Sequence, residues 1–511
     1  MADYIYTLET RLSPDQLRTV TLVQDVARAA GMNVYLTGGA VRDLISGFLI
    51  RDLDFTVQGN PLKLQKELEK GGASIQFSDD DLKVLYITGQ GNVRAEISMA
   101  RTERYEKTGK PPIVTPGTIL EDLRRRDFTV NAMALSLNPG SRGLFMDPFN
   151  GAADIEAKLI RILHNYAFVE DPSRLIRASR FAARFHWPLE ERTQARFEAA
   201  KENNYIEYIS NRAVGYEIEQ LAYEEDPVHI IKMLEKEDWL KVLSPHWTTA
   251  KIDTAGLTQL MRTRQQMGEF GLNPDPAPAV MYFLTARLSD KEISDMQKMI
   301  PRRDVVEAWR DLEDKAKDLV RRLTGKEAAT PSRTWKLLSE SRPETILFLE
   351  VTAKQQTVVQ KIRNFLGKWR QVQQKLPLPE MAELHITPQL PEYPKIAQDA
   401  FMLLLDGKLR SRTEILKFLK PLAPPPPPPP PPPRRGRAAK AAAAGTNPPT
   451  AAVAQAGGKK KGKAAPSPAP AATAPQPAPK HQKAKVTAKP TKPAPATKPA
   501  KPAAKKKAKK R

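Results

Sequence analysis

Ten consecutive prolines, Pro424 to Pro433, divide the sequence into a part that can build a hydrophobic core and a part that cannot. A proline run favours the extended polyproline II conformation and acts as a semi-rigid spacer. Behind it, residues 434–511 consist mainly of alanine, proline and lysine, with almost no large apolar side chain. Burial cannot offset the ordering entropy of such a segment, so we expect residues 421–511 to form a disordered tail.

This tail also contains nearly all of the net charge of +23. Residues 421–511 contain 17 Lys, 4 Arg and no Asp or Glu, which is a charge of +21. The first 420 residues therefore contain 81 − 21 = 60 basic and 58 acidic residues, a balance of only +2. Dispersed lysines bind RNA or other polyanions through counterion release, without sequence preference. The alternative is a solubilising tail with no fixed partner.

Composition excludes several classes of protein. The 511 residues include no cysteine, which rules out disulfides, thiolate metal sites and a cysteine nucleophile. The N-terminus shows no basic-then-apolar signal pattern, and no stretch approaches the roughly 20 apolar residues that crossing a bilayer requires. We therefore expect a cytoplasmic protein with no membrane partner.

The first 150 residues alternate between helical and strand patterns. Pro14 to Ala30 has apolar residues at helical spacing, and Ser13 is a suitable N-cap. Further helices are expected at 41–45 and 61–70, and strands at 33–37, 53–57, 84–88 and 93–99. This pattern predicts an α+β domain built on a small mixed sheet.

The pattern becomes helical almost throughout from about Asp154 to Lys420. A last helical pair is expected at 396–405 and 412–418. We therefore divide the chain into an α+β head (1–150), two helical regions (151–250 and 251–420) and the tail (421–511).

Two glycines and two carboxylates form the most specific chemical signal. Gly38 and Gly39 follow a predicted strand, where they let the backbone approach a phosphate at the start of the next helix. Asp52 and Asp54 are two residues apart on a predicted strand, so both carboxylates point to the same face. Alone, such a pair is as consistent with a solvated strand edge. Beside a phosphate-binding turn, it indicates a Mg²⁺ site for phosphoryl or nucleotidyl transfer.

A third carboxylate is expected from a neighbouring strand. Glu96, within the predicted strand 93–99, is the best candidate. It would activate the attacking hydroxyl or complete the metal shell. The alternative is a strand residue that faces solvent.

Two polar clusters follow. Arg125 and Arg126 can hold a triphosphate by bidentate hydrogen bonds, while Asp127 and Asn131 have the groups to bind a ribose. This cluster adjoins an apolar run, 128–137, that we interpret as a helix packed against the head.

The second cluster opens another helix. Pro172 suits the first helical turn, which places Asp171 at the N-cap, and Arg174 lies three residues on, on the same face. An acceptor beside a donor can hydrogen-bond the edge of a nucleobase; the alternative is an ordinary surface ion pair. Arg177, Arg180 and Arg184 continue the positions of Arg174 as a basic stripe.

In their order along the chain, these segments resemble the class II tRNA nucleotidyltransferase and bacterial poly(A) polymerase family. The resemblance is strong from about Tyr35 to Phe185, weaker up to Lys420, and does not include the tail. The segments that carry it are Leu36-Thr-Gly-Gly-Ala-Val-Arg-Asp43, Arg51-Asp-Leu-Asp54, Ala100-Arg-Thr-Glu-Arg-Tyr105, Arg125-Arg-Asp-Phe-Thr-Val-Asn-Ala132, Asp147-Pro-Phe-Asn-Gly151 and Glu170-Asp-Pro-Ser-Arg174.

The resemblance implies a polymerase-β-like catalytic head (1–150), a neck that selects the nucleotide and binds RNA (151–250) and an RNA-binding body (251–420). It also implies roles for single residues. Two Mg²⁺ ions would be held by Asp52 and Asp54. The triphosphate and ribose would be bound by Gly38, Gly39, Arg42, Arg125, Arg126, Asp127 and Asn131. ATP and CTP would be selected by Asp171 and Arg174, with Glu170 in support and Arg177 beside them.

The sequence departs from the family pattern in two places. Ser46-Gly47-Phe48 replaces the Leu-Gly-Arg common in the family between the glycines and the aspartates, and 385–420 matches loosely. The segment Ala100 to Tyr105 resembles enzymes that add only the terminal A, whereas Glu170-Asp171 resembles full CCA adders.

The resulting hypothesis is an enzyme that adds CCA, or only its terminal A, to tRNA from ATP and CTP. The second hypothesis is a poly(A) polymerase that acts on varied RNAs. A third, from another class, is a non-catalytic RNA-binding protein whose head no longer reacts.

Overall fold

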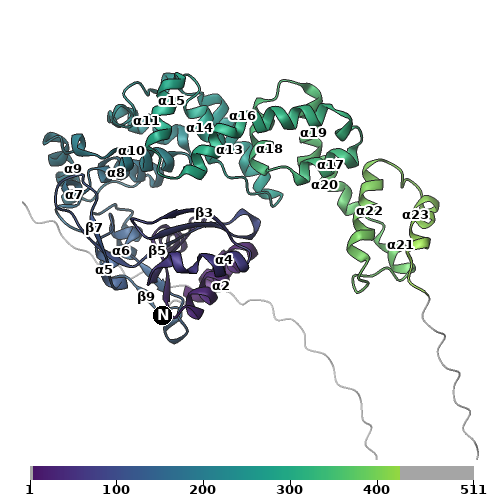
Figure 1. The fold of residues 1–511 in the computed structure, drawn as a ribbon, viewed down its shortest axis with the longest axis horizontal. Helices are drawn as coiled ribbons and strands as arrows, with labels where there is room; N and C mark the ends of the chain where they lie inside the picture. The colour runs from purple at the N-terminus through teal and green to yellow at the C-terminus, as the bar shows by residue number, and fades with distance from the viewer. Residues whose placement is uncertain (1–3, 426–511) are drawn as a thin grey trace, which may run out of the picture. The chain divides into compact units, whose positions relative to one another are not determined.

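A mixed β-sheet organises the first part of the chain (Figure 1). The computed structural model describes residues 4–425, and within them seven strands pair in the order β3-β4-β5-β2-β1-β8-β9. β2 runs parallel to β5, and the other neighbouring strands are antiparallel. The strands are β1 (Asn33–Thr37), β2 (Leu53–Gln58), β3 (Ser74–Asp79), β4 (Val84–Thr88), β5 (Arg94–Met99), β8 (Ala134–Ser136) and β9 (Phe145–Met146). The α+β head with a small mixed sheet is confirmed.

Helices α2 (Pro14–Ala29) and α3 (Gly38–Ser46) pack on this sheet. The Ser13 hydroxyl accepts a hydrogen bond from the Gln16 N–H and the Gln16 side chain answers with the reciprocal bond, so the predicted N-cap is confirmed. α3 begins at the paired glycines, directly after β1, and ends at Gly47 in the left-handed region. The backbone therefore turns sharply at the glycines between β1 and α3, next to β2.

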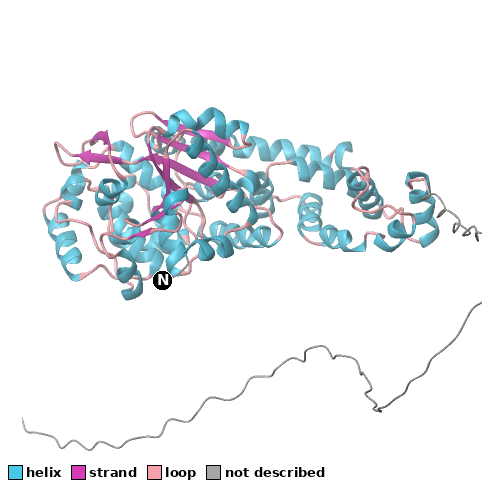
Figure 2. Ribbon diagram, turned by 90° about the horizontal axis from the view of Figure 1, so that it is seen from below, coloured by secondary structure: helices cyan, strands magenta, loops and turns pink. Residues whose placement is uncertain are grey.

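The remaining elements of residues 4–425 are helical, as expected, apart from the short hairpin of β6 (Arg101–Arg104) and β7 (Ile113–Pro116) in the head (Figure 2). The other helices of the head and the following region are α1 (Tyr4–Arg11), α4 (Gln65–Lys70), α5 (Ile119–Arg124), α6 (Gly151–Ala157), α7 (Ala167–Glu170), α8 (Ser173–Phe185), α9 (Glu191–Glu202), α10 (Asn211–Leu221), α11 (Pro227–Lys236) and α12 (Trp239–Leu243). Those further on are α13 (Thr254–Glu269), α14 (Ala277–Leu284), α15 (Asp290–Met299), α16 (Arg303–Thr324), α17 (Pro331–Glu340), α18 (Pro343–Thr352), α19 (Gln356–Leu366), α20 (Lys368–Val372), α21 (Leu378–Glu383), α22 (Tyr393–Leu405) and α23 (Arg412–Leu419).

Among residues 4–425, no helix is both long and apolar enough to cross a membrane. From residue 426 onward the predicted disordered tail lies outside the described residues.

The helix predicted at 128–137 is wrong. The chain forms one 3₁₀ turn, η3 (Thr129–Asn131), and then the strand β8, which pairs with β1. Every residue from Phe128 to Leu137 is buried, so no face of this run is exposed to solvent. Such a run shows neither the helical nor the strand period, and pairing with β1 decides its conformation.

The approach of α10 to α15 depends on one glycine. A Cβ at Gly215 would lie 1.9 Å from the Met299 carbonyl oxygen, a contact that only backbone movement can relieve. We expect Gly215→Ala to destabilise the fold by about 1–3 kcal/mol or more, measured by urea unfolding. Gly268→Ala in α13 is the matched control, because a Cβ there meets nothing within 4 Å. Equal stability of the two variants would contradict this packing.

Candidate active site

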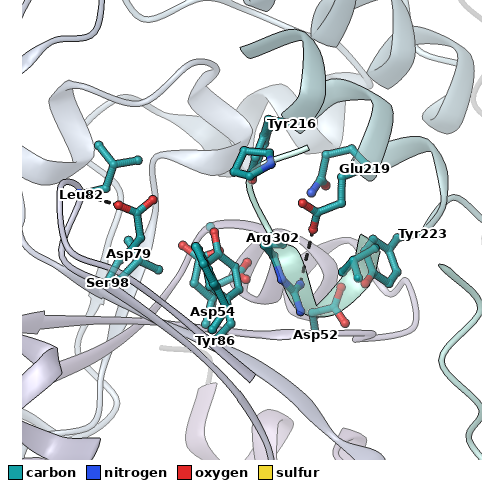
Figure 3. A pocket seen from close by; sticks show the side chains of 18 of the residues that line it. Asp52, Asp54, Asp79, Leu82, Tyr86, Ser98, Tyr216, Glu219, Tyr223 and Arg302 are labelled. Carbon is teal, nitrogen blue, oxygen red and sulfur yellow. Dashed lines mark hydrogen bonds and ion pairs between the residues drawn. The ribbon is translucent and has the colours of Figure 1, made fainter. Parts of the chain in front are cut away.

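Three carboxylates form the floor of a cavity of about 1200 Å³ (Figure 3). Asp54 on β2 lies beside Glu96 on β5, because these residues are partners in the parallel register. Asp52 lies just before β2, two residues from Asp54. The structure therefore brings together the three carboxylates that the sequence singled out.

The carboxylates differ in electrostatic environment. Burial, together with the negative charges of Glu96 and Asp52, raises the pKa of Asp54 to about 7. Burial also raises the pKa of Glu96. At Asp52 burial acts in the same sense, but the guanidinium groups of Arg94 and Arg51 outweigh it and lower the pKa. Carboxylates crowded together in this way repel one another unless a cation or proton lies between them.

Residues 4–425 contain no group of three or more His, Cys, Asp or Glu side chains that could hold a metal ion by themselves. The arrangement suits Mg²⁺ nevertheless, since this ion is usually held by one or two carboxylates together with water and substrate phosphates. Asp52 and Asp54 fit that pattern.

The glycine turn lies directly against these carboxylates. A Cβ at Gly38 would be 3.0 Å from Arg126 Nη1 and 3.1 Å from Asp54 Oδ2, and one at Gly39 would be 3.1 Å from the same oxygen. The Ala40 N–H donates a hydrogen bond to Asp54 Oδ2 over 3.3 Å. Gly38 also has a φ of +61°, which side chains rarely adopt. Both glycines are therefore required by the close approach of α3 to β2.

A buried aspartate, which the sequence analysis missed, holds the two predicted arginines. The side chain of Asp122 on α5 is fully buried and accepts hydrogen bonds from Arg125 Nη2 at 2.7 Å and Arg126 Nη2 at 2.8 Å. Burial opposes the charge, but the two guanidinium groups lower the pKa of Asp122 to about 2. The spacing was a usable signal, since Asp122 precedes the arginines by three and four residues.

Asp127 and Asn131, which the sequence predicts to bind a ribose, are hydrogen-bonded to each other. Asn131 Nδ2 donates to Asp127 Oδ1 over 3.0 Å, and Arg42 Nη1 donates to Asn131 Oδ1 over 2.7 Å. Arg42 is buried, pairs with Asp43 and lies over the ring of Phe185 at 4.8 Å. Its guanidinium therefore orients Asn131, and its edge lies beside Gly39.

Asp171 and Arg174 also line the cavity. The helix α8 begins at Ser173 with Pro172 at the N-cap, one residue later than expected. Asp171 Oδ1 accepts hydrogen bonds from the backbone and hydroxyl of Ser173 instead. Arg174 Nη2 donates to the carbonyl of Arg125 over 3.0 Å, which joins this pair to the arginine cluster. Glu170 Oε2 lies 3.4 Å from His164 Nε2.

The basic stripe on α8 is neutralised by partners on other elements. Arg177 pairs with Asp127 at 3.1 Å and with Glu217 of α10 at 2.7 Å. Arg180 pairs with Glu217 and Glu224, and Arg184 lies near Glu224 and Asp43. Sequence reasoning missed the two glutamates, of which Glu217 lies on α10 and Glu224 three residues beyond its end. This network joins the head to the helices that follow it.

The sequence of this chain is similar to those of known proteins. Residues 34–161 match the family described as "Poly A polymerase head domain". The "A-adding tRNA nucleotidyltransferase" of Halalkalibacterium halodurans is 28% identical over 418 residues, covering 80% of this chain and 93% of that protein. The "Multifunctional CCA protein" of Haemophilus ducreyi is 35% identical over 221 residues, 42% of this chain and about half (51%) of its own length.

A solved structure described as the apo form II of a CCA-adding enzyme is 27% identical, with a TM-score of 0.43, and the match covers 82% of this chain and 99% of that one. The family match spans the head that carries the glycine turn, the carboxylates and the arginine cluster. Residues 34–161 therefore form a poly(A) polymerase head domain, the chain is similar over 418 residues to an A-adding tRNA nucleotidyltransferase, and it is a nucleotidyltransferase.

Proposed function

We propose that this enzyme transfers AMP, or CMP and AMP, from ATP and CTP to the 3′ end of tRNA. The observation that carries the proposal is the meeting of Asp52, Asp54 and Glu96 with the glycine turn in one cavity. The names of the relatives, which describe A-adding and CCA proteins acting on tRNA, support the choice of substrate.

In this mechanism Asp52 and Asp54 would hold two Mg²⁺ ions. When bound, Mg²⁺ lowers the pKa of the attacking 3′-hydroxyl and neutralises charge on the phosphates. Glu96 lies beside Asp54, where it can accept the proton of that hydroxyl or orient the metal shell. Arg94 pairs with Asp52 and keeps this carboxylate ionised.

The nucleotide would lie along the arginine side of the cavity. Arg125 and Arg126 bind the triphosphate at the turn of Gly38 and Gly39, while Arg42 positions Asn131. Asp127 and Asn131 bind the ribose. Asp171 and Arg174 pair with the base edge, Glu170 supports them, and Arg177 fixes Asp127. We further propose that residues 1–150 act as the catalytic head, 151–250 as the neck and 251–420 as the RNA-binding body.

The test supplies ATP and CTP together, one of them labelled, with tRNA transcripts that end before CCA, after C and after CC, and with a generic RNA. A-addition predicts one AMP on the CC end alone, and CCA-addition predicts growth of all three tRNAs to the same length. A long tail on the generic RNA indicates a poly(A) polymerase instead. Absence of nucleotide binding by calorimetry would indicate the non-catalytic RNA-binding alternative.

We propose that the basic tail adds non-specific RNA affinity. A chain ending at Pro425 loses a charge of +21. We expect weaker tRNA binding at low salt and a shallower dependence of log Kd on log salt, because fewer counterions are released. Fluorescence anisotropy between 50 and 300 mM salt measures both. An identical slope for the two chains would show that the tail only solubilises.

A further inference from the structure

The cavity has a second wall, opposite its floor, that the roles above leave unused (Figure 3). Tyr216 and Glu219 lie three residues apart on one face of α10, and Tyr223, just beyond the end of this helix, lines the same cavity. Arg302, just before α16, completes the wall. All four side chains line the same cavity as Asp52 and Asp54.

Two buried polar atoms in this wall lack a partner. Glu219 is 2% exposed, and Arg302 Nη1 donates to its Oε1 over 3.4 Å. Glu219 Oε2 has no hydrogen-bond partner within residues 4–425, and neither has the hydroxyl of Tyr223, which is 7% exposed. Buried polar groups are nearly always paired, and an unpaired one costs about 1–3 kcal/mol. A ligand that donates to Glu219 and accepts from or donates to Tyr223 would satisfy both.

Aromatic rings and guanidinium groups link this wall to the carboxylates. Arg94 lies over the ring of Tyr223 at 3.7 Å and pairs with Asp52. Arg302 lies over the ring of Tyr86 at 4.6 Å, and Tyr86 is the register partner of Glu96. Rings of this kind offer a nucleobase surfaces to stack against. A single residue, Arg94, therefore contacts both Tyr223 of the wall and the carboxylate of Asp52.

The position of the second wall along β2 indicates which of the two substrates it can bind. Arg126, of the triphosphate side, donates to Thr56 Oγ1, two residues after Asp54 on β2. Arg94, of the second wall, contacts Asp52, two residues before Asp54. The two sets thus approach Asp54 from opposite ends of β2. In phosphoryl transfer the attacking and leaving oxygens are roughly in line, so the attacking hydroxyl arrives from the side away from the pyrophosphate.

We propose that this wall binds the 3′-terminal nucleotide of the acceptor RNA and that Glu219 Oε2 selects a base with an amino group at C4 of a pyrimidine or at C6 of a purine, which is cytosine or adenine. The inference rests on the proposed function and adds which RNA ends the enzyme accepts. A carboxylate accepts a hydrogen bond from the amino group of cytosine. Burial raises the pKa of Glu219 to about 7, so the selection is expected above that pH. Uracil and guanine present a carbonyl oxygen at the equivalent position, which would then meet the carboxylate oxygen without a proton between them.

The variant Glu219→Gln tests this selection with little change in shape. The amide retains the oxygen that accepts from Arg302 and replaces the unpartnered oxygen by an NH₂ donor. Four tRNA transcripts that differ only in their last nucleotide, and a fifth that ends in pyrimidin-2-one, which lacks the amino group of cytosine, serve as acceptors. The ratio of kcat/KM values for each pair of acceptors is measured at saturating ATP.

The wild-type enzyme should prefer a terminal C or A to U, G and pyrimidin-2-one by about tenfold or more. Glu219→Gln should reduce the ratio of C to U by about tenfold, because its NH₂ group donates to the uracil oxygen, and leave the KM for ATP unchanged. Glu225→Gln, a nearby glutamate whose side chain is 64% exposed, is the matched control and should keep the wild-type ratio.

A wild-type enzyme without preference among the five ends, or an unchanged C-to-U ratio in Glu219→Gln, overturns the proposal. A changed KM for ATP with an unchanged ratio assigns Glu219 to the nucleotide instead and also overturns it. Equilibrium binding of the five RNAs in Ca²⁺, without turnover, gives the same ranking independently of activity. Failure of the proposed function is recognised separately, as no incorporation on any RNA by the wild-type enzyme.

Discussion

Asp54→Asn should lower kcat for nucleotide incorporation by roughly 10³-fold or more while the enzyme still folds and binds ATP. Asp54 is the central carboxylate of the floor, beside Glu96 in register and in contact with the helix α3 that begins at the glycine turn. The amide has the same shape but no negative charge, so Mg²⁺ loses a ligand that water cannot replace. Single-turnover incorporation of labelled AMP measures the loss.

Thermal unfolding distinguishes this loss from misfolding. Asp54 is crowded by Glu96 and Asp52, and burial together with these charges raises its pKa to about 7. Removing its charge therefore relieves repulsion, and we expect the Tm of metal-free Asp54→Asn to equal or exceed that of the wild type. Asp25→Asn, at a surface aspartate that is 53% exposed, is the control and should retain both activity and Tm. Retained activity in Asp54→Asn would remove Asp54 from the metal site.

The second large effect is expected at Asp122, the buried anchor of the arginine cluster. Asp122→Ala leaves Arg125 and Arg126 without their shared carboxylate, and breaking a buried ion pair in this way costs about 3–5 kcal/mol. The released guanidinium groups also lose the orientation that would hold a triphosphate. We expect a lower free energy of unfolding in urea and at least tenfold weaker ATP binding by calorimetry. Asp318→Ala, at a half-exposed ion pair of α16, should change neither.

Asp122 also makes stability depend on pH. The pKa of Asp122 is lowered to about 2 in the folded chain, against an ordinary value of 3.8. A carboxyl whose pKa is depressed by folding stabilises the protein fully above its unfolded pKa and loses this contribution as the pH falls through the folded value. The contribution is roughly 2 kcal/mol at neutral pH and should decline between about pH 4 and pH 2. In Asp122→Asn the free energy of unfolding should fall less over this interval; an equal fall would contradict the assignment.

Much of the head follows from local sequence. The capping box at Ser13, the glycine pair before α3 and the strands β2, β4 and β5 each have a clear periodic or conformational signature. The long helical region was predicted for the same reason. The strand β3 and the hairpin of β6 and β7 were missed, and 128–137 was assigned the wrong conformation. In these segments partner strands, rather than the residues themselves, provide the decisive hydrogen bonds.

Within the site, sequence alone determined the chemical groups: the glycine pair, the carboxylates Asp52 and Asp54, and the arginines at 125 and 126. These lie within short segments whose spacing directly reflects strand and helix geometry. The tertiary structure decided which residues these groups interact with. Asp122 holds the arginines, Glu217 and Glu224 neutralise α8, and Arg94 joins Asp52 to the wall that contains Glu219. Charges and hydrogen bonds act over a few ångströms in space, and residues about 40 to 130 positions apart, such as Arg94 with Asp52 and with Tyr223, become neighbours only when the chain has folded.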